Sequence, residues 1–274
     1  MQLDVLGQST FCHTGGHPLE PGRPTLVLVH GVLNAHKVWL AQAEALAAQG
    51  WNVLAPDLPG HLGSRGSPPA SVEAAADFLL GLLDAAGVEQ AVLAGHSFGS
   101  LAALEAAARA PARVLHLVLI GTACPMKVSP ALLAAALAAP QEAIDKVAGY
   151  SHSREAVQAA LLARPQAPTP IDLTRTLMQQ VLASNPQVPL LHVGLQACDQ
   201  YRGGEAAMSK VQCPTLFLLG RHDVMTPPEA VASLKACARR GQTVVIDSGH
   251  ALMGDNPDGL MAALRAFLPV ARAR

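Results

Sequence analysis

The chain has 274 residues and a formal net charge of -1; half of its residues (50%) are hydrophobic and only 14% are charged. This balance excludes an intrinsically disordered chain, which combines low hydrophobicity with high charge. Because no cluster of Lys and Arg stands out, neither nucleic acid nor a membrane surface is expected as a partner. The length allows one large domain, with or without an insertion. No feature of the sequence indicates an oligomeric state.

Residues 1–7 lack a basic segment followed by an apolar run, so no signal peptide is expected. The longest apolar run, residues 131–139, is far shorter than the roughly 20 residues that a membrane span needs. The five cysteines occur singly, without a Cys-x-x-Cys pair, and an odd number without regular spacing fits a reducing compartment. We interpret them as small hydrophobic residues and predict a cytoplasmic protein with no metal site and no cofactor.

Short apolar segments alternate with longer Ala- and Leu-rich segments in the first half of the chain. The predicted elements are, in chain order, a strand at 26–29, a helix at 35–49, a strand at 52–55, a turn-rich segment at 56–69, a helix at 71–86, a strand at 91–94, a helix at 98–110 and a strand at 114–120. Ser71 is suited to cap the second helix and Gly87 to end it.

Residues 125–210 interrupt this alternation with many prolines and helical segments but no clear strand, and we interpret them as a helical cap inserted over the sheet. The alternation resumes with a strand at 215–219, a helix at 228–240, a strand at 243–246 and a helix at 257–268. Continuously apolar strands separated by helices predict an α/β fold, with a mostly parallel central sheet and helices on both faces. The predicted domains are a core formed by 1–124 and 211–274 and a cap or lid formed by 125–210.

The sequence Gly-His-Ser-Phe-Gly at residues 95–99 matches the Gly-x-Ser-x-Gly motif and lies between a predicted strand and a predicted helix. In that context the serine stands on a sharp turn, and the flanking glycines leave room where strand and helix crowd together. We therefore predict Ser97 as a nucleophile. The alternative is a tight turn in a nucleotide-binding sheet, but no Gly-x-Gly-x-x-Gly sequence follows any strand.

Asp223 and His250 follow the last two predicted strands. Catalytic groups gather at the carboxyl ends of parallel strands, and the chain order Ser, Asp, His is the one that such a fold uses. We predict that Asp223 orients His250 and that His250 takes the proton of Ser97. Asp57 also follows a strand, but its Pro- and Gly-rich surroundings favour a role in stabilising a turn.

An oxyanion hole requires two backbone N–H groups directed at one point. We predict the N–H of Phe98, directly after the nucleophile, and the N–H of Val32, in the loop after the strand at 26–29. The neighbouring His30 is interpreted as a structural histidine that binds only backbone.

In their order, these motifs resemble those of the α/β-hydrolase superfamily, and most of all small bacterial members with a serine nucleophile, such as carboxylesterases. The matching stretches are Leu-Val-His-Gly at 28–31, Asp-Leu-Pro-Gly-His-Leu-Gly-Ser at 57–64, the serine motif at 95–99, Leu-Gly-Arg-His-Asp at 219–223 and Gly-His at 249–250. The resemblance implies an early antiparallel strand within residues 1–20 and a helical lid. A serine at position 97 separates the chain from members with an aspartate nucleophile, such as epoxide hydrolases and dehalogenases.

The resulting hypothesis is a serine hydrolase that cleaves a small to medium, largely uncharged ester or thioester through an acyl-serine intermediate. Its partner is a small-molecule substrate, bound in an apolar cleft to which the side chains of Val32 and Phe98 contribute and where Arg221 is the main charge. The shared triad leaves acyltransferases, cofactor-free haloperoxidase-like enzymes and carbon–carbon bond hydrolases open. A non-catalytic small-molecule receptor on the same fold is the alternative from another class.

Overall fold

The computed structural model describes residues 1–269, so residues 270–274 of the predicted core lie outside the described residues. The strands are β1 (Gln2–Val5), β2 (Gln8–His13), β3 (Thr25–Val29), β4 (Asn52–Pro56), β5 (Ala91–His96), β6 (Val114–Ile120), β7 (Thr215–Gly220) and β8 (Gly241–Ile246). The core helices are α1 (Leu40–Ala47), α2 (Val72–Ala85), α3 (Phe98–Arg109), α10 (Ala232–Cys237), α11 (Leu252–Asp255) and α12 (Pro257–Phe267).

One eight-stranded sheet runs through the molecule in the order β1-β2-β4-β3-β5-β6-β7-β8. β1 and β2 pair antiparallel, and β2 also pairs antiparallel with β4. From β4 to β8 every pair is parallel. The predicted α/β fold with a mostly parallel sheet is therefore confirmed, and the early segment contributes two antiparallel strands at one edge.

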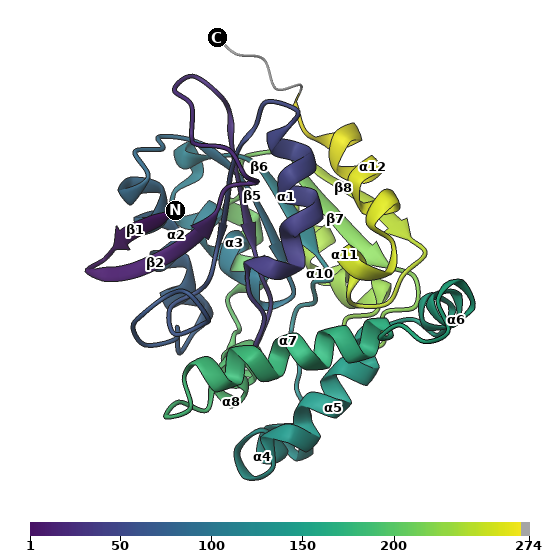
Figure 1. Ribbon diagram of the computed structural model, residues 1–274. Coiled ribbons are helices and arrows are strands. Elements are labelled where there is room, and N and C mark those ends of the chain that lie inside the picture. Colours follow the sequence, from purple (N-terminus) through teal and green to yellow (C-terminus); the bar gives the residue numbers. More distant parts are fainter. Residues whose placement is uncertain (270–274) are drawn as a thin grey trace.

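Both faces of the sheet are covered, which explains why its central strands are apolar throughout. In β3, Leu26 and Leu28 pack on one face and Val27 and Val29 on the other, and all four are fully buried. The first face is covered by α1, α11 and α12, and the second by α2, α3 and α10 (Figure 1). The six parallel strands, β3 to β8, thus bring their carboxyl ends to one edge of a core that is covered on both faces.

Two predicted helices begin with a turn of 3-10 helix instead of α-helix. Residues His36–Trp39 precede α1, and Pro228–Val231 precede α10. In the first case the Asp57 carboxylate accepts the N–H of His36 at 2.8 Å. That long-range contact orients the opening turn, and no local side chain caps it.

The predicted cap, residues 125–210, consists of helices and contains no strand. Its helices are α4 (Pro130–Ala138), α5 (Pro140–Ser151), α6 (Arg154–Ala163), α7 (Pro170–Ser184), α8 (Leu190–Gln200) and α9 (Gly204–Lys210). Figure 1 shows α4 to α8 set apart from the sheet. α4, α5, α7 and α8 share a small apolar cluster that also includes Leu33 and Ala35 from the loop after β3, whereas α9 packs on α3 and α10. None of the helices within residues 1–269 is long and apolar enough to cross a membrane.

Candidate active site

Ser97 occupies the sharp turn between β5 and α3 with φ 53° and ψ −120°. A positive φ is unfavourable for a residue with a side chain, so the surrounding structure has to hold it in place. Gly95 and Gly99 make this possible. A Cβ on Gly95 would overlap the carbonyl of Gly99, and a Cβ on Gly99 would lie 2.6 Å from the carbonyl oxygens of Val29 and His30.

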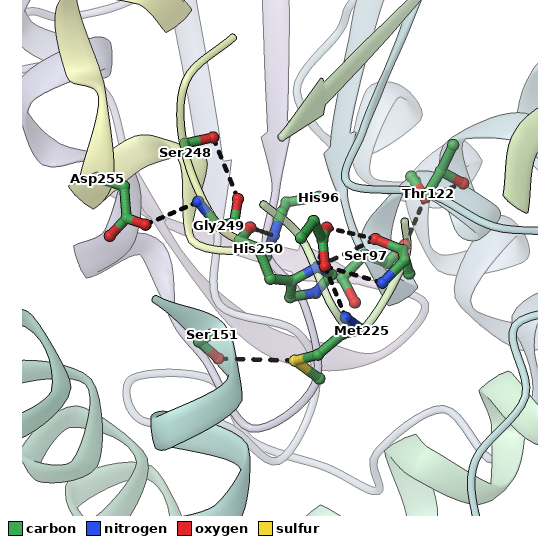
Figure 2. A network of polar contacts seen from close by, with 12 residues as sticks. His96, Ser97, Thr122, Ser151, Met225, Ser248, Gly249, His250 and Asp255 are labelled. Atoms are coloured by element: carbon green, nitrogen blue, oxygen red, sulfur yellow. Dashed lines mark hydrogen bonds and ion pairs between the residues drawn. The ribbon is translucent and has the colours of Figure 1, made fainter. Parts of the chain in front are cut away.

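The backbone of Ser97 is fixed from both sides. Its N–H donates to the carbonyl of Ile120 at 2.9 Å. Its own carbonyl lies 2.5 Å from the Ser100 hydroxyl, which is in turn 2.8 Å from the hydroxyl of Thr122 (Figure 2). These contacts tie the turn to β6 and the loop that follows it, so the backbone of Ser97 is held in this conformation.

Asp223 and His250 meet in the loops after β7 and β8. His250 Nδ1 lies 2.8 Å from Asp223 Oδ2, and both residues are buried. The other carboxylate oxygen accepts the N–H groups of Met225 and Thr226, each at 2.8 Å, and the Thr226 hydroxyl donates to Oδ2 at 2.6 Å. An ionised Asp223 with these donors places the His250 proton on Nδ1 and leaves Nε2 free to accept another.

The electrostatics of Asp223 follow from the same contacts. Burial by itself would raise the pKa of this carboxyl group, but the nearby His250 and the hydrogen bonds from His250 and Thr226 outweigh it, so the pKa is lowered. Thr226 was not singled out from the sequence. The available indication was an Asp in a turn, where its side chain commonly binds the backbone that follows.

His96 is a second histidine at this site, although the sequence alone favoured no special role for it. Its Nε2 donates to the carbonyl of His250 at 2.8 Å, and the two ring centroids are 4.7 Å apart. Burial, followed by the proximity of His250, lowers the pKa of His96 to about 3, so its ring is neutral. Its Nδ1 is buried without a hydrogen-bond partner among the described residues. His96 thus holds the main chain of His250 beside Ser97 (Figure 2).

His30 and Asp57 belong to a separate buried network below the site. His30 Nδ1 donates to the carbonyl of Gly31 at 2.8 Å, and its Nε2 accepts the N–H of Leu58 at 3.0 Å, so both nitrogens bind backbone. Asp57 accepts from the N–H and the ring of His36, each at 2.8 Å. The carboxylate that the structure brings to His250 is therefore that of Asp223.

A cavity of about 370 Å³ lies above Ser97, between the core loops and the cap. Its walls are mostly apolar, and residues from both parts of the chain contribute. The core contributes Gly31, Val32, Asn34, Val38, His96, Ser97, Val224, Met225, Thr226, His250, Ala251 and Met253, and the cap contributes Met126, Lys127, Val128, Ser129, Leu132, Val147, Tyr150, Ser151, Thr174, Met178, Leu195 and Cys198.

Two expectations about this cavity were wrong. The side chain of Phe98 is buried in the main apolar core, so Val32 lines the cavity and Phe98 does not. Arg221 is exposed, and the cation at the cavity wall is Lys127 instead. Phe98 is nevertheless the first residue of α3, so its N–H has no acceptor within that helix. Within residues 1–269, no group of three or more His, Cys, Asp or Glu side chains is arranged to hold a metal ion.

Comparison with known proteins identifies the family of the chain. Residues 24–257 match the family model of the alpha/beta hydrolase fold. The chain is 28% identical to the sn-1-specific diacylglycerol lipase of Mus musculus, over 89% of this chain and 81% of the relative. It is 30% identical to the pimeloyl-acyl-carrier-protein methyl ester esterase of Neisseria meningitidis, over 80% of this chain and 83% of the relative.

Among solved structures, the enol-lactonase of Burkholderia xenovorans LB400 superposes with a TM-score of 0.83, covering 97% of this chain and 99% of the other at 20% identity. At that identity the likeness shows the fold alone. The family match and the two relatives bear out the resemblance found in the sequence. The chain belongs to the α/β hydrolase family and is an enzyme.

Proposed function

We propose that this hydrolase cleaves a small to medium, largely uncharged carboxylic ester or thioester through an acyl intermediate on Ser97. The observation that carries the proposal is the meeting of two features in one apolar cavity. One is Ser97, held at a φ of 53° on its turn. The other is His250, whose Nδ1 is bound by the buried Asp223 and whose ring lines the same cavity.

In the first half of the reaction, His250 Nε2 takes the hydroxyl proton as Ser97 Oγ attacks the carbonyl carbon of the substrate. The tetrahedral intermediate then collapses, the carbon–oxygen or carbon–sulfur bond breaks, and the leaving group receives that proton from His250. In the second half a water molecule repeats the sequence on the acyl-enzyme and frees Ser97. Asp223 keeps the proton on Nδ1 and stabilises the imidazolium that forms twice per turnover.

The negative oxygen of the intermediate requires donors that are already in place. We assign them to the backbone N–H groups of Val32 and Phe98, as the sequence predicts. Phe98 opens α3, where the N–H groups of the first turn and the helix dipole both favour an anion. Loss of one such donor typically costs on the order of 10²-fold or more in rate.

The composition of the cavity supports an apolar acyl group of variable shape. Its lining includes Met126, Met178, Met225 and Met253. Methionine side chains are unbranched and adapt to irregular shapes, so a cavity lined by them can bind related acyl groups of different shapes. The names of the two relatives, a diacylglycerol lipase and a methyl ester esterase, also support an ester as the bond that is cleaved.

A fluorophosphonate probe followed by intact-protein mass measurement tests this function. We expect one adduct per chain in the wild-type protein and none in Ser97→Ala. Ser209→Ala is the control, because Ser209 is exposed on α9 and does not line the cavity, and it should leave labelling unchanged. Turnover of a p-nitrophenyl ester and of an acyl thioester would then separate the two bond types. A folded wild-type protein that is neither labelled nor active would overturn the proposal in favour of a receptor.

A further inference from the structure

The loop that carries His250 is in direct backbone contact with residues 151–153 of the cap. The carbonyl of Ser151, the last residue of α5, accepts the N–H of Ala251 at 2.7 Å. On the other side of His250, the chain at Gly249 approaches so closely that a Cβ there would lie 2.6 Å from the backbone nitrogen of Ser153. Both neighbours of His250 therefore rest on the cap.

Asp255, at the end of α11, binds these two segments together. Its Oδ2 accepts the N–H of Gly249 and the N–H of Ser153, each at 2.8 Å (Figure 2 shows the first). Its Oδ1 lies 2.6 Å from Nδ1 of His152, and the Asp255 side chain is fully buried. Burial by itself would raise the pKa of this carboxyl group, but the hydrogen bonds from His152 and the two backbone N–H groups outweigh it, so the pKa is lowered.

His152 extends the same network to the wall of the cavity. Its Nε2 lies 2.8 Å from the hydroxyl of Thr174 on α7, and Thr174 lines the cavity above Ser97. An unbroken series of polar contacts thus runs from Thr174 through His152 and Asp255 to Gly249, the residue before His250. Neither His152 nor Asp255 lines the cavity itself, so neither side chain contacts a substrate bound there.

We propose that Asp255 is a positioning residue for His250, and that it acts by joining residues 151–153 of the cap to the loop of His250. The main chain of His250 is then held at three successive points. Asp255 binds the N–H before it, His96 binds its own carbonyl and Ser151 binds the N–H after it. Catalytic geometry is sensitive to such support, because a displacement of about 1 Å can cost on the order of 10²-fold in rate.

This role rests on the proposed function, since it takes His250 as the base. The first test is a pair of Gly→Ala variants. In Gly249→Ala the added Cβ meets backbone atoms of residues 152 and 153, and pushes the cap segment away from the loop. In the control Gly254→Ala the nearest atom is His152 Cε1 at 3.9 Å, so nothing has to move. We expect Gly249→Ala to lower kcat on the order of 10²-fold, with KM within a few-fold, and Gly254→Ala to match the wild type.

The second test removes the charge of Asp255 and keeps its shape. Asp255→Asn should lower kcat and the rate of fluorophosphonate labelling by about tenfold, the effect of losing a charge-assisted hydrogen bond. Asp247→Asn is the control on the same loop, because the Asp247 side chain is exposed and pairs with His222, away from the cap. Hydrogen exchange over residues 247–253 supplies a readout besides activity, and we expect faster exchange in Asp255→Asn alone.

The outcomes separate the two proposals. If the wild-type protein is labelled and active but Asp255→Asn and Gly249→Ala keep its kcat and labelling rate, Asp255 does not position His250 and only this inference fails. The inference also fails if both variants merely lose thermal stability while their folded fraction reacts at the wild-type rate. If the wild-type protein is neither labelled nor active, the proposed function fails, and the role of Asp255 falls with it.

Discussion

The length of the acyl group is expected to control the rate of hydrolysis, because the cavity above Ser97 is apolar and finite. Each methylene that moves from water into such a site gains about 0.8 kcal/mol, which corresponds to about a fourfold rise in kcat/KM per carbon. The gain should stop when the cavity of about 370 Å³ is full. A volume near the lower end of the range for small-molecule sites favours short to medium acyl groups.

A series of p-nitrophenyl esters from acetate to palmitate measures this dependence directly. Met178→Ala adds a second perturbation, since Met178 is fully buried and lines the cavity from α7. Truncation should move the optimum to longer acyl groups while costing about 2–5 kcal/mol of stability. The matched control is Met208→Ala. Met208 is equally buried but packs in the main core, away from the cavity, so its loss should destabilise the protein and leave the optimum unchanged.

Several results would refute this reasoning. A gain in kcat/KM that continued without a break to palmitate would indicate an open, lipase-like site. A requirement for a charged acyl group would indicate that Lys127, and not the apolar walls, governs binding. An optimum that moved equally in Met178→Ala and Met208→Ala would show that loosened packing, and not cavity size, sets the preference.

Three further outcomes are expected. Ser97→Ala should abolish ester turnover while the free energy of urea unfolding changes little. His250→Ala should lose activity to a similar extent, because the nucleophile and its base act as a unit. Appreciable turnover by Ser97→Ala would exclude the acyl-serine route. Asp223→Asn should lower kcat by about 10⁴-fold through the wrong tautomer of His250, and a near-wild-type rate in a p-nitrophenyl ester assay would show that another group orients the base. Burial lowers the pKa values of His30 and His96 from 6.5 to about 3. The unfolded chain therefore binds protons below pH 6.5 that the folded protein does not bind until about pH 3. As the pH is lowered through this window, the free energy of unfolding should decrease by about 1.4 kcal/mol per pH unit for each of the two histidines. Urea titrations at pH 7.5, 6 and 5 check the slope, and a stability independent of pH would mean that these rings accept protons in the folded state.

Much of the core could be predicted from the sequence because the deciding interactions are local. The runs at β3, β5 and β6 are almost entirely apolar, as a strand buried on both faces requires, and the structure buries nearly all of those side chains. The Ser71 cap of α2 is also local, since its hydroxyl binds the N–H of Ala74 three residues later. Likewise, the glycines on either side of Ser97 are enough to indicate a crowded turn.

The contact between Asp223 and His250 could be predicted for a related reason. Parallel strands bring their carboxyl ends to one edge, so residues directly after β5, β7 and β8 have to come near one another. That topology, together with chain order, pointed to Ser97, Asp223 and His250, and the structure places Asp223 against His250 in a loop beside Ser97. Their chemical roles remain predictions for the assays above.

Tertiary structure alone decided the parts of the site that depend on distant contacts. Asp255 and His152 are separated by 103 positions in the chain, and His96 and the carbonyl of His250 by 154. No periodicity or motif in the sequence predicts such pairs, because they form only when distant segments of the chain pack together. For the same reason the sequence assigned Phe98 and Arg221 to the cleft, whereas packing turned Phe98 into the core and placed Lys127 at the cavity wall. The local sequence determines where strands, helices and turns form. Which side chains line the cavity depends on how the cap packs on the core, because each residue there is buried by segments distant in the chain.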